Sequence, residues 1–420
     1  MRQEQYDVAV IGGGSAGMAA AGSLARKGKS VVLFEREDVL GGILLQCIHN
    51  GFGLHHFNEE LTGPEYAERC SKTLEELPVK VYVGSTVMQM EESQSGEGKL
   101  VYAYSRAYGI VMAQVSAVVL AMGCRERNRG NIGTPGTRPA GVYTAGLAQR
   151  LVNVEGYIPG KEVVIVGSGD IGLIMARRMT WVGAKVKAVV EIQPYPAGLT
   201  RNIVQCLNDF SIPLYLSHIV SEIHGKNRVE AVTITPMVDG MPDTQRSFRV
   251  ECDTVLLSVG LVPDNEVSKK LGVQLNPETN GALVDSRLMT NVPGVFACGN
   301  VLHVHDLVDF VTEESTRCGE YVAGYLDGVR PAAQHRVVAG SNVKYVLPNW
   351  YDRAHDNRFY LRPMVVKNRA ELQVRLDGQL IKTKVLKHVQ PSEMIALALD
   401  PKDLGDGAPQ GDLKLEIAIV

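Results

Sequence analysis

A strand–turn–helix pattern built around three spaced glycines occurs twice in this chain and constrains its fold more than any other feature. The first copy follows an apolar run at residues 6–11 and reads GGGSAG at residues 12–17. The second copy follows residues 162–166 and reads GSGDIG at residues 167–172. Shifting the first copy by 155 residues (12 to 167) superposes all three glycines on those of the second. The repetition predicts an α/β fold that contains two similar nucleotide-binding units.

Each glycine of the first turn has its own physical role. Gly12 permits a tight turn, Gly14 lets a pyrophosphate approach the backbone, and Gly17 lets the helix pack closely on the strand. The N-terminus of the helix, beside Ser15 and Ala16, offers free N–H groups and a positive dipole to the phosphates. One such motif can also be an ordinary glycine turn, but the flanking strand and helix favour a Rossmann-like dinucleotide site.

An acidic residue ends the strand that follows each helix. Glu35 stands 23 residues after Gly12, and Glu191 follows the strand predicted at residues 185–190. A carboxylate here accepts hydrogen bonds from ribose hydroxyls and repels a 2′-phosphate. Glu191 therefore favours NADH over NADPH, although Arg201 follows ten residues later. The dinucleotide contacts expected in the second unit are Gly167, Gly169, Asp170, Ile171, Gly172 and Glu191.

Two further apolar runs end in glycine, one after each unit. Residues 117–123 and 254–260 each read as a buried strand, and they end at Gly123 and Gly260. Either run taken alone is simply a core strand. Their spacing, one behind each glycine turn, favours strand ends that lie beside a bound nucleotide.

Charge and apolar patterning argue against several classes of protein. The chain has 43 basic and 46 acidic side chains, which argues against a nucleic-acid-binding protein or a polybasic membrane anchor. The longest apolar run, residues 111–123, is too short to span a bilayer, and no charged-then-apolar leader precedes the first strand. We therefore expect a cytoplasmic protein without a transmembrane segment.

The seven cysteines include no Cys-x-x-Cys pair. The two closest in sequence, Cys298 and Cys318, are 20 residues apart. This spacing argues against zinc ribbons, most iron–sulfur clusters and a short redox dithiol loop. An odd number of cysteines at low density favours a reducing compartment.

Together these landmarks resemble the flavoproteins with two dinucleotide-binding domains that are related to the pyridine nucleotide-disulfide oxidoreductases. The resemblance implies FAD in the first unit and NAD(P)H in the second. The segment at residues 294–300 resembles the second flavin motif, with Gly299-Asn300 where the family usually has Gly-Asp; Asn can hydrogen-bond a hydroxyl but brings no charge. The FAD contacts so implied are Gly12, Gly14, Ser15, Ala16, Gly17, Glu35, Arg36, Gly41, Gly42, Ala121, Gly123, Gly299, Asn300, Leu307 and Val308.

A helix is predicted after this motif, from about Asp306 or Asp309 to residue 326. We expect N–H groups near Leu307 and Val308 to face the flavin's pyrimidine oxygen and to stabilise the anion formed on reduction. The acidic residues and histidines of this region are His303, His305, Asp306, Asp309, Glu313 and Glu314. A metal ion is one interpretation, but acidic residues at a helix start commonly pair with its dipole, so no metal site is predicted.

The disulfide-reducing members of the family carry a Gly-Gly-Thr-Cys-x₄-Cys segment after the first unit. Residues 41–49 of this chain read GGILLQCIH, with Leu44 and His49 in place of the two cysteines, so disulfide reduction is not expected. The resemblance puts Cys47 and His49 near the flavin ring as candidate catalytic residues, and His49 could shuttle a proton to reduced flavin. The alternative is a buried small thiol and a satisfied polar wall residue.

Three segments are similar to a narrower group of proteins. Residues 41–54, 167–179 and 298–315 resemble flavoprotein subunits associated with anaerobic glycerol-3-phosphate dehydrogenase systems. They are more remotely similar to the NAD(P)/FAD subunits of opine and hydrogen-cyanide-forming dehydrogenases. The resemblance implies a partner redox subunit that oxidises the substrate. A homo-oligomer remains open.

The last part of the chain lacks the glycine landmarks and predicts a small antiparallel β domain, either a packing lid or a docking surface. The strands expected there are residues 343–347, 358–361, 371–376, 380–387, 394–399 and 413–420. The expected domains are an FAD-binding domain at 1–150 and 263–330, an inserted NAD(P)-binding domain at 151–262, and this β domain at 331–420.

The sequence supports one principal functional hypothesis and two alternatives. The principal hypothesis is an FAD-dependent NAD(P)H oxidoreductase that transfers hydride between NADH and FAD and exchanges electrons with a partner protein or small acceptor. The first alternative is a dehydrogenase subunit that oxidises an amine, an opine or glycerol phosphate directly at FAD. The second is a flavin-based redox sensor or scaffold, against which the complete second glycine motif counts.

Overall fold

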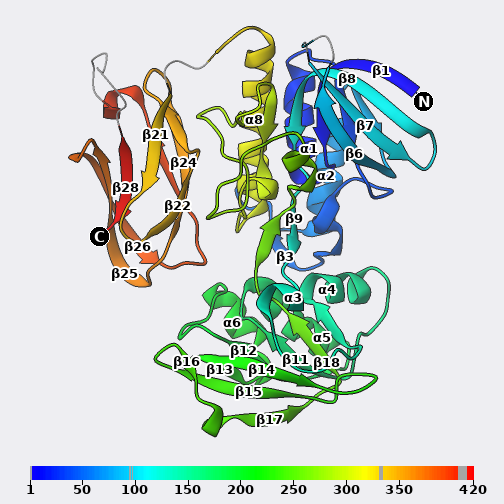
Figure 1. Cartoon of the computed structure of the whole chain (residues 1–420), viewed down its shortest axis with the longest axis vertical. Helices are drawn as coiled ribbons and strands as arrows, with labels where there is room; N and C mark the ends of the chain where they lie inside the picture. Colours follow the sequence, from blue (N-terminus) through cyan, green and yellow to red (C-terminus); the bar gives the residue numbers. More distant parts are fainter. Residues whose placement is uncertain (1, 94–95, 97, 331–333, 405–413) are drawn as a thin grey trace. The chain divides into compact units, whose positions relative to one another are not determined.

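The computed structural model describes residues 2–93, 96, 98–330, 334–404 and 414–420. The chain divides into two compact units (Figure 1). Unit 1 comprises Met1–Cys124 and Pro263–Val420, and unit 2 comprises Arg125–Val262. Unit 2 is therefore inserted into the sequence of unit 1. Within the described residues, no helix is both long and apolar enough to cross a membrane.

A seven-stranded sheet forms the centre of the first part of unit 1. Its strands are β1 (Arg2–Ile11), β2 (Val31–Phe34), β5 (Val79–Tyr82), β6 (Ser85–Glu92), β7 (Lys99–Ser105), β8 (Gly109–Leu120) and β20 (Val295–Ala297). The order is β5-β2-β1-β8-β7-β6, and β20 also pairs with β8. The strands β1, β2, β5, β8 and β20 run parallel, whereas β6 and β7 form an antiparallel extension. The carboxyl ends of β1, β8 and β20 therefore lie side by side, where open α/β sheets bind ligands.

The helices of unit 1 pack against this sheet and against each other. They are α1 (Ser15–Arg26), α2 (Gly63–Glu75), α7 (Glu266–Lys270) and α8 (Val308–Leu326), with the 3-10 turns η1 (Gly42–Gln46) and η4 (Gly299–Val301) and the short strands β3 (Asn50–Phe52) and β4 (Leu61–Thr62). A Cβ on Gly319 of α8 would lie 2.6 Å from Cβ of Ser23 on α1. The glycine therefore permits the close approach of the two helices.

Unit 2 is built on a five-stranded parallel sheet. Its strands, in the order β10-β18-β11-β12-β13, are β10 (Val142–Thr144), β18 (Thr254–Leu257), β11 (Glu162–Val166), β12 (Lys185–Glu191) and β13 (Leu214–Leu216). The other elements are α3 (Arg129–Ile132), α4 (Ala145–Asn153), α5 (Asp170–Trp181), α6 (Thr200–Cys206), η2 (Asn208–Phe210), β14 (His218–His224), β15 (Ala231–Val238), β16 (Met241–Pro242), η3 (Thr244–Arg246) and β17 (Phe248–Glu251). The boundary strands are β9 (Cys124–Glu126) and β19 (Leu261–Pro263).

Alternating side chains bury both faces of this sheet. Val163 and Ile165 of β11 share one core with residues of α4, α5 and α6. Val164, between them, belongs to a second core with residues of β14 and β15. A strand covered on both sides reads as a continuous apolar run, and this is why residues 162–166 could be recognised from sequence.

The start of unit 2 differs from the boundary expected at residue 151. The unit begins at Arg125, because β10 pairs with β18 of its sheet. Ala145 and Ala148 of α4 belong to the same core as the nucleotide-turn helix α5. The segment between residue 125 and residue 150 carries no glycine motif, so its membership of unit 2 depends on pairing with a strand that comes over 100 residues later.

The C-terminal part of unit 1 is a β sandwich. One sheet has the order β23-β21-β28-β25-β26 and the other β22-β24-β27. The bounds are β21 (Gln334–Ala339), β22 (Val343–Leu347), β23 (Trp350–Asp352), β24 (Asn357–Pro363), β25 (Lys367–Leu376), β26 (Gln379–Val389), β27 (Ile395–Leu399), η5 (Pro401–Leu404) and β28 (Leu415–Ile419). Neighbouring strands are antiparallel, as predicted, except that β21 and β28 pair in parallel. The strands β21 and β23 were not predicted, and residue 413, the expected start of the last strand, lies outside the described residues.

Candidate cofactor sites

The first glycine turn has the geometry that a dinucleotide site requires. Gly12 has a φ of +105°, and a Cβ there would lie 2.4 Å from the carbonyl oxygen of Ala121. A Cβ on Gly17 would lie 1.8 Å from the carbonyl oxygen of Gly12. A Cβ on Gly14, by contrast, would meet no described atom within 4 Å. Gly12 and Gly17 are therefore required by packing, whereas Gly14 faces space that a ligand can occupy.

The N-terminus of α1 is available to an anion. Gly14 is its N-cap and, in the part of the chain that the structure describes, no side chain caps it; the first turn carries no acidic residue. The helix α2 differs, because Thr62 and Glu65 form a capping box at its start. Uncapped N–H groups at Ser15 and Ala16 and the helix dipole favour a phosphate at α1.

A second loop lies across this turn. Gly41 forms an isolated parallel β-bridge with Gly14, and its N–H donates to the carbonyl of Gly13 over 2.9 Å. Gly41 and Gly42 have φ angles of +122° and +57°, and a Cβ on Gly42 would lie 3.2 Å from Cα of Gly14. The structure thus brings Gly41 and Gly42 next to Gly14, as expected for one site, whereas the side chain of Arg36 is exposed.

Both strand-end glutamates are buried and bind the backbone of their own glycine turn. Glu35 accepts hydrogen bonds from the N–H groups of Gly13, at 2.6 Å, and Glu37, at 2.8 Å. Glu191 accepts from the N–H and hydroxyl of Ser168, at 2.9 and 2.7 Å, and from the N–H of Gln193. Each carboxylate therefore holds its turn, and its remaining acceptor capacity is available to a ribose.

The second glycine turn repeats the first in detail. Gly167 has a φ of +93°, and a Cβ there would lie 2.1 Å from the carbonyl oxygen of Ser258. A Cβ on Gly172 would lie 2.7 Å from the carbonyl oxygen of Gly167, whereas a Cβ on Gly169 would meet only the Ser258 hydroxyl, at 3.7 Å, among the described atoms. Gly169 is therefore the equivalent of Gly14 in unit 2.

The other residues predicted for unit 2 have mixed positions. Asp170 accepts hydrogen bonds from the N–H of Leu199 and the amide of Asn202, so its carboxylate holds the start of α6. Ile171 is half-buried and packs against the core of α4 and α5. Gly260 has a φ of +102° near the end of β18. Asp170 thus links α5 to the start of α6, and Ile171 anchors α5 in the core of unit 2.

A cavity of about 340 Å³ lies at the carboxyl ends of β10 and β18, whose last residues Thr144 and Leu257 line it together with Arg129 and Arg138. The Arg129 guanidinium donates to three backbone carbonyls within residues 134–137, so it holds that loop. Burial, with the neighbouring charge of Arg138, lowers the pKa of Arg129. This edge of a parallel sheet is where nucleotides bind, and no sequence motif marked Arg138.

The second flavin motif meets α1. Gly299 has a φ of +70°, and a Cβ there would lie 2.7 Å from Cβ of Ala16. Asn300 accepts from the N–H of His305 at 3.0 Å and donates to the thiol of Cys124 over 3.7 Å. The side chain that replaces the family's usual Asp therefore orders its own loop. Ala121 is buried at the end of β8, and Gly123 has a φ of +72°.

The helix α8 begins at Val308, between the two predicted starts. Leu307 is the N-cap, and no described side chain caps the helix. Asp309 is buried and accepts hydrogen bonds from the N–H groups of His56, at 2.8 Å, and Gly53, at 3.2 Å. Asp309 thereby ties the loop at residues 53–56 to α8, a role that its position at a helix start did not reveal.

The surroundings of Cys47 and His49 differ in polarity. Cys47 is buried, and burial raises the pKa of its thiol to about 12. Its thiol donates to the carbonyl of Ile43 over 3.3 Å. His49 is half-buried, with Nδ1 3.1 Å from the carbonyl oxygen of Asn50 and its ring 4.9 Å from that of Phe52. Cys47 is thus a neutral thiol at pH 7, which fits the packing alternative, while the polar His49 retains the capacity for proton transfer.

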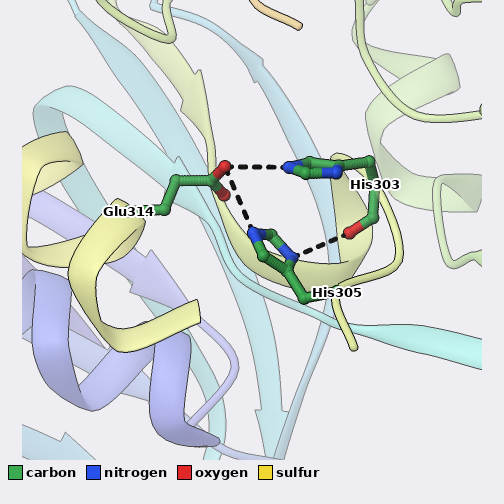
Figure 2. A group of neighbouring side chains, drawn as sticks. All are labelled: His303, His305 and Glu314. Atoms are coloured by element: carbon green, nitrogen blue, oxygen red, sulfur yellow. Dashed lines mark hydrogen bonds and ion pairs between the residues drawn. The ribbon is translucent and has the colours of Figure 1, made fainter. Parts of the chain in front are cut away.

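All seven cysteines lie in the described part of the chain, and all are free. Cys298 and Cys318 are buried, and a thiol–thiol hydrogen bond between them, with burial, raises the pKa of Cys318. Their separation in sequence gave no sign of this contact. The side chains of His303, His305 and Glu314 also come together, in a buried group shown in Figure 2.

Comparisons with known proteins agree with this geometry. A family model described as pyridine nucleotide-disulphide oxidoreductase matches residues 6–319. The hydrogen cyanide synthase subunit HcnB of Pseudomonas protegens is 26% identical over 301 residues, which cover 65% of this chain and 60% of that protein. Thioredoxin reductase of Bacillus subtilis is 27% identical over 301 residues, covering 70% of this chain and 86% of that protein.

Solved structures show the same fold. The crystal structure of T. acidophilum thioredoxin reductase superposes with a TM-score of 0.63 at 23% identity, covering 76% of this chain and 98% of that one. The chain spans about 60% of the length of the HcnB relative that it matches. The matched region contains both glycine turns and the second flavin motif, but not the C-terminal β sandwich.

Proposed function

Because the chain belongs to the pyridine nucleotide-disulphide oxidoreductase family, whose members are FAD- and NAD(P)-dependent oxidoreductases, we propose that it transfers hydride between NADH and FAD. The observation that carries this proposal is the duplicated glycine turn. In each unit the first and third glycines are locked by backbone contacts, and Gly14 or Gly169 faces open space at a helix N-terminus. Two such sites fit two dinucleotides.

The residues of unit 1 fit FAD. Gly14, Ser15 and Ala16 would hold the pyrophosphate at the N-terminus of α1, with Glu35 beside the adenosine ribose. Gly299 would bring the flavin's ribityl chain close to α1. FAD, when bound, supplies two-electron chemistry; the protein supplies close approach, orientation and exclusion of water.

We propose NADH rather than NADPH as the preferred nucleotide. Glu191 is buried at the end of β12, and its carboxylate is fixed by three hydrogen bonds from Ser168 and Gln193. A carboxylate held at this position repels a 2′-phosphate. Arg138 lines the cavity at the ends of β10 and β18 and is a candidate contact for the diphosphate that NADH and NADPH have in common.

His49 is proposed to move a proton to or from reduced flavin. Its imidazole lies on the segment that replaces the dithiol of the disulfide-reducing relatives, two residues after the buried Cys47. Imidazole titrates near neutral pH and transfers protons efficiently there. Cys47, as a neutral thiol, is proposed to pack beneath this segment without entering the reaction.

Electrons are proposed to pass to or from a partner redox subunit. Two similarities support a subunit role: the HcnB relative is a subunit of hydrogen cyanide synthase, and three segments resemble flavoprotein subunits of glycerol-3-phosphate dehydrogenase systems. Direct oxidation of an opine or of glycerol phosphate at FAD would instead need a pocket beside the flavin with a cationic side chain for the anionic group of the substrate.

The experiment that tests the proposal is anaerobic mixing of the FAD-loaded protein with NADH or NADPH. The absorbance of oxidised flavin should fall after mixing, faster with NADH than with NADPH, and should recover when an artificial electron acceptor is added. The absence of bleaching with either nucleotide, in protein that has retained FAD, would contradict hydride transfer. Bleaching by glycerol phosphate or an amine instead would support the direct dehydrogenase.

A further inference from the structure

Two histidines and a glutamate form a buried group where the segment after Gly299 meets α8 (Figure 2). The side chains of His303 and His305 are fully buried, and that of Glu314 is 1% exposed. Their ligand atoms all lie within 4.8 Å of one another. Two imidazoles around one carboxylate are a donor set that divalent transition metals prefer.

The carboxylate oxygen Oε2 of Glu314 is the centre of the group. It lies 2.9 Å from Nε2 of His303 and 3.4 Å from Nε2 of His305. The other oxygen, Oε1, accepts a hydrogen bond from the N–H of Gly299 over 2.7 Å. The 2.9 Å contact is an ordinary hydrogen bond, whereas 3.4 Å exceeds the usual range of about 2.7–3.2 Å, and Nε2 of His305 has no hydrogen-bond partner among the described residues.

The hydrogen bond on the other ring nitrogen of His305 sets its tautomer. Nδ1 lies 3.1 Å from the carbonyl oxygen of His303, and a carbonyl only accepts, so Nδ1 carries the proton. In the neutral ring, Nε2 then presents a lone pair toward the Glu314 carboxylate (Figure 2). Two facing lone pairs in a buried site repel each other unless a cation, either a metal ion or a proton, lies between them.

We propose that His303, His305 and Glu314 bind a divalent metal ion of the zinc type. Bonds of about 2.0–2.2 Å in tetrahedral or octahedral geometry put neighbouring ligand atoms about 3.0–3.5 Å apart, close to the 2.9 and 3.4 Å found around Oε2. The bonds from His305 Nδ1 to the His303 carbonyl and from Gly299 to Glu314 are the outer contacts that orient metal ligands. Nδ1 of His303 makes no hydrogen bond with the described residues.

The surroundings permit a cation. Arg362, a cationic side chain that influences His303, pairs with Asp306 at 2.8 Å and is thereby neutralised. The ring of Tyr360 lies 5.5 Å from that of His303 and 5.8 Å from that of His305. A metal ion here would join the loop after the second flavin motif to the second turn of α8, and so would hold together both segments that carry predicted flavin contacts. This inference does not depend on the proposed reaction.

The first test measures metal in the full-length protein, purified without chelator or affinity metal, by inductively coupled plasma mass spectrometry. We expect about one zinc per chain. Glu314→Gln preserves side-chain shape and the acceptor for Gly299, and it should lower the bound metal at least about tenfold. The matched controls are Glu313→Gln, next to it on α8, and His355→Ala, an exposed histidine that pairs with the buried Asp352; both should retain wild-type metal.

The second test uses wild-type protein alone, so it does not depend on whether a variant folds. Chelator-treated protein is titrated with Co²⁺ and followed by visible ligand-field absorption, and its thermal midpoint is measured with and without Zn²⁺. Saturation near one equivalent and a raised midpoint support the site. If neither Co²⁺ nor Zn²⁺ binds, or if Glu313→Gln loses metal equally with Glu314→Gln, the cation at His305 is a proton and the proposal is wrong.

Discussion

The glycines of the two turns divide, residue by residue, into those that the chain needs for its own packing and those that a ligand needs. Gly12, Gly17, Gly167 and Gly172 cannot carry a side chain, because a Cβ would collide with backbone. Gly14 and Gly169 have ordinary negative φ angles and open surroundings. The position of each glycine in the motif predicts this division, and the backbone contacts of the folded chain agree with it.

Replacing Gly14 by Ala should therefore weaken FAD binding and leave the fold intact. The new Cβ enters the space where a pyrophosphate would approach the backbone, and we expect at least about a tenfold rise in the FAD dissociation constant, roughly 1.4 kcal/mol. Fluorescence titration of apoprotein with FAD measures the affinity. Gly22→Ala, in the same helix and with ordinary contact distances, is the control, and an equal affinity in both variants would contradict the prediction.

The thiol of Cys47 should be unreactive in the folded protein at neutral pH. The pKa of Cys47 in the folded protein is about 12, against a usual 9.0, so only about 10⁻⁴ of the thiol is ionised at pH 8. Because the folded chain keeps this thiol protonated to a higher pH than the unfolded chain does, its contribution to stability is complete below pH 9 and is lost as the pH rises through 12. Mass spectrometry after iodoacetamide treatment at pH 8 should show Cys47 modified in unfolded protein and protected in folded protein. Cys47→Ser should keep the wild-type rate of flavin reduction; a tenfold loss would restore it as a catalytic residue.

His49→Ala should slow reoxidation of reduced flavin by the electron acceptor. If His49 carries the proton, removal of the imidazole should cost about 10²-fold in the acceptor-dependent rate, with little effect on reduction by NADH. His49→Gln keeps hydrogen bonding but cannot titrate, and it should be equally slow. Double-mixing stopped-flow separates the two half-reactions, and an unchanged reoxidation rate in both variants would remove His49 from the mechanism.

At the scale of elements, the strands and helices next to the glycine turns were predicted well. The second turn is preceded by β11 and followed by β12, whose limits agree with residues 162–166 and nearly agree with residues 185–190. The helices α1 and α5 begin at Ser15 and Asp170, directly after the N-caps Gly14 and Gly169. Polar and glycine residues in a first turn resemble loop in sequence, but the glycine N-caps permit the helix to start there.

The strand end at Glu191 should decide the choice of nucleotide. We expect the wild-type protein to have at least about a tenfold higher kcat/KM with NADH than with NADPH, and Glu191→Gln should reduce this ratio about tenfold, because the amide no longer repels a 2′-phosphate. Gln preserves most of the shape that Ser168 and Gln193 hold. Steady-state rates with both nucleotides measure the ratio.

The duplicated site provides the control for this prediction. Glu35→Gln changes the equivalent residue of unit 1, which also bonds its own glycine turn. It should alter FAD affinity and leave the NADH to NADPH ratio unchanged. A ratio that responds to Glu35 and not to Glu191 would mean that the two cofactors are assigned to the wrong units.

At the scale of the whole molecule, long-range pairing decides which segments belong together. Arg362 of β24 donates to Asp306, just before α8, and to the carbonyl of Val304, while Asp306 also accepts from the N–H of Met394. The nearby Asp306 raises the pKa of Arg362. These contacts attach the β sandwich to the segment that follows the second flavin motif, which favours the packing interpretation of the C-terminal domain.

Arg362→Met should therefore destabilise this part of the molecule. Leaving Asp306 without its mostly buried partner should lower the free energy of unfolding by about 2 kcal/mol, whereas Lys72→Met, which removes an exposed pair with Glu68, should leave the unfolding midpoint nearly unchanged. Urea unfolding in a Trp181→Phe background lets Trp350 report on the sandwich. Equal midpoints for the two variants would contradict the attachment.

The sequence by itself determined the two nucleotide turns, their strands and helices, and the family, because these depend on contacts between residues close together in the chain. The tertiary structure alone decided that residues 125–150 join unit 2, that Cys298 and Cys318 touch, and that His303 and His305 meet Glu314. The chemistry of these cysteines, histidines and Glu314 depends on their burial and on partners that the fold brings into contact with them. The spacing of residues along the chain reveals neither which residues become buried nor which become partners, because strands distant in sequence become neighbours only when a sheet buries their apolar faces.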